Sequence, residues 1–411
     1  MANLRSVYPF HADAGFGHRG VFMGVNTTGG MSGFYFDPFE FYADRHLTNP
    51  NMIVMGSVGT GKSATVKALI RRLRAVYGEQ RYLAIIDPKG EYGTVAADLG
   101  LARVALRPGG THCLNPLDDV GPQRSDSSIE RERLVSQLVT GVLGHRLSMG
   151  EDAVLGWAVK RCWERGAPFT LHDVSRQLKE PAEELIAMTY MSPLELSHTT
   201  SQVILALDKL CNRALKGMFD GPTTVNIDWD HGPGVLLDLS AVYSNQEALP
   251  LVMVAATHWL AAALRGRRDR RAVQVIDEAW AAVRDGAEYF QSSLKLARAH
   301  GVATVLVVHR PSDLAAQSDD GSASSKIASG LLSDIQTRVL LKQPTEQIDE
   351  AAKLFDLSQR ERLWLANLPQ GRAIWRIGSR AAVVHNVLSP AEYALFKTDS
   401  AMLGEAGDEH E

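Results

Sequence analysis

Residues 56–63 read GSVGTGKS, a spacing of glycine, lysine and serine that can bind the phosphates of a nucleotide. Glycines allow successive backbone N–H groups to point at one anion. A helix that begins near Lys62 would add the positive end of its dipole. In this pattern Lys62 reaches the β- and γ-phosphates and the Ser63 hydroxyl binds Mg²⁺. We therefore expect ATP and Mg²⁺ as ligands, with the nucleotide held by Gly56, Ser57, Val58, Gly59, Thr60, Gly61, Lys62, Ser63 and Ala64.

The sequence VQVIDEAW, residues 273–280, places two acids directly after an apolar run. Hydrolysis of a nucleotide needs an acid that holds the magnesium shell and a group that positions water. We predict that Asp277 holds Mg²⁺ through water and that Glu278 orients and polarises the attacking water. The alternative is a helix that starts with a capping Asp and a first-turn Glu, without catalysis. With a phosphate loop upstream, the catalytic interpretation is preferred, and the chain is predicted to be an ATPase.

Further polar residues follow the next apolar runs. His309 and Arg310 end the run after Asp277, so either could touch the γ-phosphate as a sensor; a histidine satisfied by the backbone is the alternative for His309. Arg338, on a strand expected to flank the sheet edge, is the first candidate for an arginine that reaches the γ-phosphate of a neighbouring subunit. Arg372 is the second candidate.

The segment IIDPKGEYG, residues 85–93, leaves two interpretations open. Asp87 could lie near the magnesium shell at the carboxyl edge of the sheet. It could equally end a strand in a turn that Pro88 and Gly90 favour, with Lys89 and Glu91 paired locally.

The elements that must position these residues have the pattern of an α/β fold. An apolar run before residue 56, helical spacing over residues 66–76 and a second apolar run at 81–87 predict strand, loop, helix and strand, the start of a mostly parallel sheet. From about residue 125 to 221 the spacing becomes helical, which predicts a helical subdomain inserted into the sheet domain; a continuous α/β sheet is the alternative. Residues 371–387 read as an antiparallel hairpin.

These patterns divide the chain into four parts. We expect the first part of the ATPase domain at 1–122, the inserted helical subdomain at 123–230, the second part of the ATPase domain at 231–398 and an acidic, disordered tail at 399–411.

Composition restricts the partners. The 411 residues are 45% hydrophobic and 22% charged with a net charge of −4, so any surface for nucleic acid must be local. The candidates are RRDRR at 267–271, which could also be a solvated turn, and the Ser/Asp/Ala-rich loop at 315–329. The three cysteines are far apart, which fits a reducing compartment. The apolar segment at 249–264 is shorter than a bilayer requires, and we interpret it as a buried helix.

The motifs NMIVMGSVGTGKS, IIDPKGEYG, LNPLDD, MFDGPT, GVLLDLS, VIDEAW and GRAIWRIG occur in an order similar to the C-terminal motor domain of VirB4/TraC-type conjugation ATPases, of the HerA/FtsK group. This resemblance implies a RecA-like motor that assembles as a hexamer and powers a type IV secretion machine. It assigns residues 56, 59 and 61–63 to the nucleotide loop, Asp277 to magnesium and Glu278 to catalysis. Two departures are His309, where the family usually has glutamine, and a phosphate loop too early for the large N-terminal docking domain of the family.

Three functions follow as hypotheses. The first is a cytoplasmic motor for conjugation or secretion, reaching the inner face of the membrane through partners, with other secretion components and copies of itself as binding partners. The second is a HerA/FtsK-like translocase acting on DNA. The third is a scaffold whose assembly ATP controls; Glu278 argues against it, because a scaffold needs no catalytic acid.

Overall fold

The computed structural model describes most of the chain. The described residues are 16–28, 30–118, 128–166, 168–180, 183–265, 270–283, 290–291, 294, 298–311, 330, 332 and 334–397. The predicted acidic tail, the whole 315–329 loop and residues 267–269 of the RRDRR run lie outside them.

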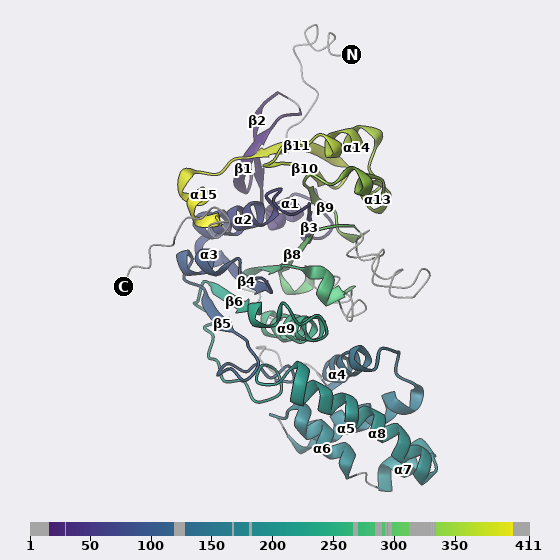
Figure 1. Cartoon of the computed structure of the whole chain (residues 1–411). Coiled ribbons are helices and arrows are strands. Elements are labelled where there is room, and N and C mark those ends of the chain that lie inside the picture. Colours follow the sequence, from purple (N-terminus) through teal and green to yellow (C-terminus); the bar gives the residue numbers. More distant parts are fainter. Residues whose placement is uncertain are drawn as a thin grey trace.

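Eleven strands of the described residues form one sheet in the order β2-β1-β11-β10-β9-β3-β8-β7-β4-β6-β5 (Figure 1). The seven strands from β9 to β5 pair in parallel, and the remaining four extend the sheet antiparallel. The α/β prediction with a mostly parallel sheet is confirmed. The strands are β1 (Val21–Asn26), β2 (Ser32–Phe36), β3 (Met52–Met55), β4 (Arg81–Asp87), β5 (Ala102–Ala105), β6 (Gly234–Asp238), β7 (Arg271–Ile276), β8 (Val302–Val308), β9 (Thr337–Leu340), β10 (Arg372–Ile377) and β11 (Arg380–Asn386).

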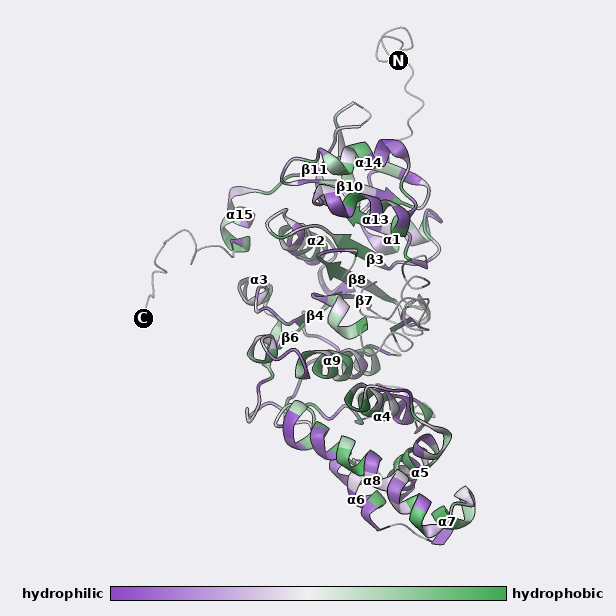
Figure 2. Ribbon diagram, turned by 45° about the vertical axis from the view of Figure 1, so that its right-hand side comes forward, coloured by the Kyte–Doolittle hydropathy of each residue, from purple (hydrophilic) through white to green (hydrophobic). Residues whose placement is uncertain are grey.

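The parallel strands β3, β4, β6 and β8 are buried on both faces, which explains their largely apolar sequences. Side chains alternate between the faces, so that Met52 and Val54 pack with one core and Ile53 and Met55 with the other. On the first face lie α2 (Lys62–Tyr77) and α3 (Gly93–Asp98). On the second lies α9 (Ala248–Leu264), the buried helix expected from its apolar sequence (Figure 2).

Between β5 and β6 the chain leaves the sheet and forms a group of helices, which we call the helical group (128–214). It contains α4 (Ser128–Leu143), α5 (Met149–Arg165), α6 (Leu171–Lys179), α7 (Glu183–Thr189), α8 (Pro193–Lys209) and a π-helical turn (Leu210–Ala214). The group lies at one end of the molecule, beyond α9 (Figure 1). It falls inside the 123–230 segment predicted as the inserted subdomain, and α4 contacts α9 there.

The shorter helices begin where local sequence specifies it. Capping boxes open α14 (Gln359–Ala366) and α15 (Pro390–Phe396), each with a serine and a glutamate that satisfy orphan N–H groups. The helix α13 (Thr345–Phe355) precedes α14. The predicted hairpin at 371–387 is confirmed as β10 and β11. One detail of the helical spacing was wrong, because Val76 of α2 is 62% exposed.

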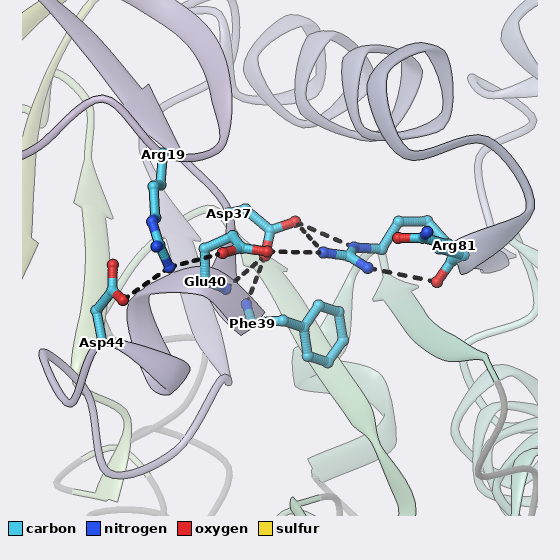
Figure 3. Close-up of polar contacts among 7 residues, drawn as sticks. Arg19, Asp37, Phe39, Glu40, Asp44 and Arg81 are labelled. Atoms are coloured by element: carbon cyan, nitrogen blue, oxygen red, sulfur yellow. Dashed lines mark hydrogen bonds and ion pairs between the residues drawn. The ribbon is translucent and has the colours of Figure 1, made fainter.

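The short helix α1 (Pro38–Ala43) lies between β2 and β3 in the chain. Asp37 caps it, accepting from the N–H groups of Phe39 at 2.7 Å and Glu40 at 2.8 Å (Figure 3). The other Asp37 oxygen accepts from Arg81 Nε and NH2, at 3.1 and 3.0 Å. Because Arg81 opens β4, this buried ion pair joins the N-terminal elements to the parallel strands.

None of the helices in the described ranges combines the length and apolar character needed to cross a membrane.

Candidate nucleotide site

The predicted site residues meet where the parallel strands end. The phosphate loop follows β3, His309 follows β8, Asp277 follows β7 and the 87–91 turn follows β4. These four strands are neighbours in the sheet, in the order β3, β8, β7, β4. Ligands of parallel α/β sheets bind outside this carboxyl edge. Residues that are far apart in the sequence therefore come together at one place.

The phosphate loop leads from the end of β3 into the first turn of α2. Gly61 has φ +101° at the N-terminus of α2, a conformation that favours glycine. A Cβ at Gly56 would lie 2.7 Å from Leu341 Cβ, so this position also requires glycine. Val58 and Gly59 are exposed at the crest, while Ser63 is half-buried in the first helical turn. The loop thus presents backbone N–H groups and a helix N-terminus to an incoming anion.

Lys62 is buried, and its Nζ donates to the carbonyl of Ser57 at 2.9 Å. Burial, together with the positive charge of Lys89, lowers the pKa of Lys62 to about 8. A phosphate beside the ammonium would stabilise its charged form. The loop therefore holds the buried Lys62 ammonium at a place where the negative charge of a bound phosphate would offset the cost of burying it.

Asp277 is 3% exposed, and its Oδ1 accepts from the N–H of Glu278 at 3.0 Å. Burial and the nearby charges of Glu278, Glu91 and Asp87 raise the pKa of Asp277 to about 7. A cation bound at this carboxylate would reverse that effect. Asp277 therefore fits a place where a metal ion compensates for crowded negative charge.

Glu278 has every side-chain oxygen engaged. Its Oε1 lies 2.5 Å from Lys89 Nζ and 2.5 Å from His309 Nε2, and its Oε2 accepts from the indole of Trp280. Burial alone would raise its pKa, but the hydrogen bonds and charges of His309 and Lys89 lower the pKa of Glu278 to about 2. The backbone of Glu278 has φ +50°, an uncommon conformation for a residue with a side chain. Strain and buried charge thus coincide at the predicted catalytic acid.

Asp87 forms the turn rather than a ligand site in this structure. Its carboxylate accepts from four backbone N–H groups, those of Lys89 at 3.2 Å, Gly90 at 2.8 Å, Glu91 at 3.1 Å and Tyr92 at 2.8 Å. The hydrogen bonds agree with the turn of the second interpretation, but the local pairing of Lys89 with Glu91 was wrong, because the Lys89 ammonium pairs with Glu278. The turn affects the candidate site, because it places the Lys89 ammonium in contact with the Glu278 carboxylate.

Two glutamines near the site were not anticipated. Gln343, 2% exposed after β9, donates to the carbonyl of His309 at 3.4 Å, and Gln370 donates to the carbonyl of Gly59 at 2.9 Å. Nothing in the local sequence distinguishes them from other loop glutamines. Their positions depend on β9 lying beside β3 and on the turn before β10 reaching the phosphate loop.

The arginine candidates occupy places that differ from expectation. The strand that carries Arg338 is interior, between β3 and β10, because the β10–β11 hairpin and β1–β2 extend the sheet beyond it; the expectation of an edge strand was wrong. The Arg338 guanidinium donates to the carbonyls of Ile335 at 3.0 Å and Phe355 at 2.9 Å in its own chain. Arg372 is half-buried at the start of β10. The role of Arg338 in a neighbouring site stays a prediction.

The described part of the RRDRR run is structural. Arg270 donates to the carbonyls of Glu79 at 2.6 Å, Asp230 at 2.8 Å and Gly232 at 2.9 Å. It therefore ties the 78–80 turn and the 230–232 loop to the start of β7 and is not directed at a polyanion. Arg271 is exposed where β7 begins, at the opposite end of the strand from Asp277.

The donors present fit a magnesium ion held together with nucleotide phosphates. In the described ranges no group of three or more His, Cys, Asp or Glu side chains could hold a metal. Mg²⁺ bound with phosphates uses only one or two protein ligands and keeps several waters. The Ser63 hydroxyl and the crowded Asp277 carboxylate supply ligands of that kind.

Comparison with known proteins identifies the family. The profile of the HerA helicase central domain matches residues 45–256, more than half of the 411 residues. The chain belongs to the HerA central-domain family. The match runs from before the phosphate loop, through the helical group, into α9.

A sequence relative and a solved structure agree with the resemblance to VirB4/TraC-type ATPases. Protein TraC of Escherichia coli (strain K12) is 22% identical over 321 residues, 77% of this chain and 35% of TraC. The chain thus spans about a third of the curated relative. The structure of VirB4 of Thermoanaerobacter pseudethanolicus has a TM-score of 0.73 at 20% identity, covering 92% of this chain and 100% of that one.

The fold is also similar to that of the plasmid coupling protein TrwB. Its complex with ADP and Mg²⁺ has a TM-score of 0.57 at 16% identity, covering 82% of this chain and 86% of that chain. Its complex with the ATP analogue ADPNP has a TM-score of 0.58 at 17% identity, covering 82% and 85%. Nucleotide and Mg²⁺ therefore bind to a protein with this fold.

Proposed function

We propose that this chain hydrolyses ATP as the motor of a conjugation or type IV secretion system. The observation that carries the proposal is the position of Glu278, a buried acid next to Asp277 and on the same sheet edge as the phosphate loop. A nucleotide-binding scaffold would not need a strained, buried carboxylate there. The names of its relatives, TraC, VirB4 and TrwB, support the conjugation context.

Each residue of the site has a role that follows from its position. The loop N–H groups and the α2 terminus bind the phosphates, and Lys62 balances the charge of the β- and γ-phosphates. Ser63 and Asp277 hold Mg²⁺, which neutralises charge on the phosphates when bound. Glu278 orients the attacking water, with His309 in contact with its carboxylate.

We further propose a ring, a hexamer, in which neighbouring subunits complete each site. Secretion components would be its other partners, and it would act in the cytoplasm at the inner face of the membrane. A specific observation favours a second candidate, a DNA translocase: the matching family is described as a helicase. Arg338 and Arg372 remain the candidates for an arginine acting on a neighbour.

The test is the steady-state ATPase rate per subunit against protein concentration, with and without double-stranded DNA. A rate that rises with concentration supports sites shared between subunits. Strong stimulation by DNA favours the translocase, and no response to DNA favours the secretion motor. A rate that is zero under all of these conditions contradicts the ATPase assignment.

Two variants separate binding from chemistry. Lys62→Ala is expected to abolish nucleotide binding, because the loop loses its charge partner for the phosphates. Glu278→Gln is expected to keep binding but to lose turnover by about 10²-fold or more, since the group that orients water loses its charge. Lys160→Ala, an exposed position on α5, is the matched control and should change neither quantity. Normal turnover by Glu278→Gln would exclude this residue as the catalytic acid.

A further inference from the structure

The Lys89 ammonium lies at the centre of the polar groups around Glu278. Its Nζ is 2.5 Å from Glu278 Oε1 and 2.8 Å from His309 Nε2, and it lies 5.7 Å from the centroid of the Tyr243 ring. The backbone N–H of Lys89 is held by Asp87. The base of the side chain is therefore fixed, while its four-carbon stem remains able to move the charge.

In this arrangement Glu278 is poorly suited to act on water. Lys89 and His309 share its Oε1, and Trp280 occupies Oε2. Such contacts stabilise the ionised carboxylate and leave it a weak base. Three of the roughly four hydrogen bonds that a carboxylate can accept are already made, so the withdrawal of Lys89 would both make room for an attacking water and strengthen Glu278 as a base.

Lys89 is also close to where the γ-phosphate must lie. An attacking water bridges Glu278 and the γ-phosphate, which puts the phosphate about two hydrogen-bond lengths, roughly 6 Å, from the carboxylate. Lys89 is in contact with that carboxylate, and its charge acts on Lys62. A small movement of the stem would transfer the ammonium from carboxylate to phosphate.

We propose that Lys89 exchanges partners: it holds the Glu278 carboxylate when no γ-phosphate is present and moves to the γ-phosphate of bound ATP, which frees Glu278 to orient water. The inference rests on the proposed ATPase function. The exchange also assigns a role to the 87–91 turn, because Asp87 holds the Lys89 backbone at a position from which the ammonium reaches either Glu278 or the γ-phosphate. ADP lacks the γ-phosphate and leaves Lys89 on Glu278.

A double-mutant cycle measured by binding tests the exchange. The affinities of ADPNP and ADP, each with Mg²⁺, are measured by calorimetry for the wild-type chain, Lys89→Met, Glu278→Gln and the double variant. We expect Lys89→Met to weaken ADPNP binding about tenfold, the loss of one charge-assisted contact, and to change ADP binding less than about twofold. Glu278→Gln should tighten ADPNP binding severalfold, because Lys89 no longer has a competing carboxylate.

The decisive quantity is the coupling between the two changes. If Lys89 exchanges, the gain from Glu278→Gln shrinks or vanishes in the Lys89→Met background. If Glu278→Gln tightens ADPNP equally in both backgrounds, relief of repulsion explains the gain and the exchange is wrong. Equal weakening of ADP and ADPNP by Lys89→Met also overturns it.

Three control variants separate loss of the Lys89 charge from general effects on binding or folding. Lys89→Arg retains the charge and should preserve the preference for ADPNP over ADP. Lys160→Met removes an exposed lysine and should leave both affinities unchanged. Lys89→Gln replaces Lys89→Met if the latter lowers the thermal midpoint strongly. Wild-type protein that does not bind ADP contradicts the proposed function itself, whereas ADP binding without coupling contradicts only the exchange.

Discussion

The carboxyl edge of the parallel strands gathers several buried charges at one place, whereas the helical group (128–214) buries Arg131 and Glu151 apart from each other and carries other ion pairs at its surface. At the sheet edge Lys62, Asp277 and Glu278 are 6%, 3% and 2% exposed. In the helical group the ion pair of Lys160 and Glu164 has side chains 70% and 48% exposed. Buried charge is costly unless it is paired, whereas exposed pairs contribute little to stability. The difference indicates that the sheet edge is built for a ligand and the helical group for packing.

Apolar residues show the reverse distribution. The strands of the sheet edge are buried on both faces, while Met149, Tyr190 and Leu194 of the helical group are 93%, 94% and 82% exposed. Its helices are instead defined by local devices, such as the capping boxes that open α5 and α8. Strand pairing therefore holds the sheet together, whereas the helical group depends on contacts between helices whose first turns are marked by local signals.

The largest effect on stability is expected at the buried ion pair of Figure 3. Asp37→Ala leaves the buried Arg81 with only the more distant carboxylate of Glu40, at 3.9 Å, and removes the cap of α1, so we expect a loss of about 3–5 kcal/mol. The matched control is Asp44→Ala, since Asp44 pairs with the exposed Arg19 and should contribute less than about 1 kcal/mol. Urea unfolding midpoints measure both. Equal losses would mean that burial does not decide the strength of these pairs.

A smaller effect, dependent on pH, is expected at the junction between the two regions. His258 of α9 is buried and contacts Gln137 of α4, with Nε2 and Oε1 3.1 Å apart. Burial lowers the pKa of His258 well below 6.5, so below that pH the unfolded chain binds a proton that the folded chain excludes. Stability should therefore fall as pH falls, by about 1.4 kcal/mol per unit from this group.

The histidine contribution is isolated by difference. His258→Gln keeps a donor toward Gln137 but does not titrate, so the free energy of unfolding should depend less steeply on pH between about 6.5 and 5. The wild-type chain at each pH is the reference. Parallel pH profiles for the two proteins would show that His258 is not held neutral.

The smallest effect is expected in the helical group. Ser148→Ala removes the capping box of α5, and we expect a loss of about 1 kcal/mol, with faster hydrogen exchange in the first turn. Ser197→Ala, at an exposed position within α8, is the control and should stay within about 0.5 kcal/mol. A cap effect as large as that of Asp37→Ala would remove the contrast between local and long-range stabilisation.

Much of the site could be predicted because its signals are local. The 56–63 loop is contiguous, and the spacing of its glycines, lysine and serine is enough to predict phosphate binding. Asp277 and Glu278 directly follow an apolar run that predicts a strand, so their position at the strand end could also be predicted. The apolar segment at 249–264 also identified α9, because a helix that is apolar on all sides has to be buried.

The remainder was decided by pairing between distant segments. Arg338 was expected on a flanking strand, but the place of β9 depends on which strands add beyond it. Arg72 of α2 pairs with Glu392 of α15 at 2.6 Å, a contact between segments 320 residues apart. Neither partner can be chosen from local periodicity, because many acids and many strands are equally compatible with it.

The sequence by itself determined the phosphate loop, the acid pair and the α/β pattern, since each depends on residues close together in the chain. Only the tertiary structure decided that Lys89 and His309 hold Glu278 and that Gln343 and Gln370 reach the site. The physical reason is the sheet. Parallel strands that are far apart in the chain end at the same edge, and the order in which they pair selects which side chains meet there.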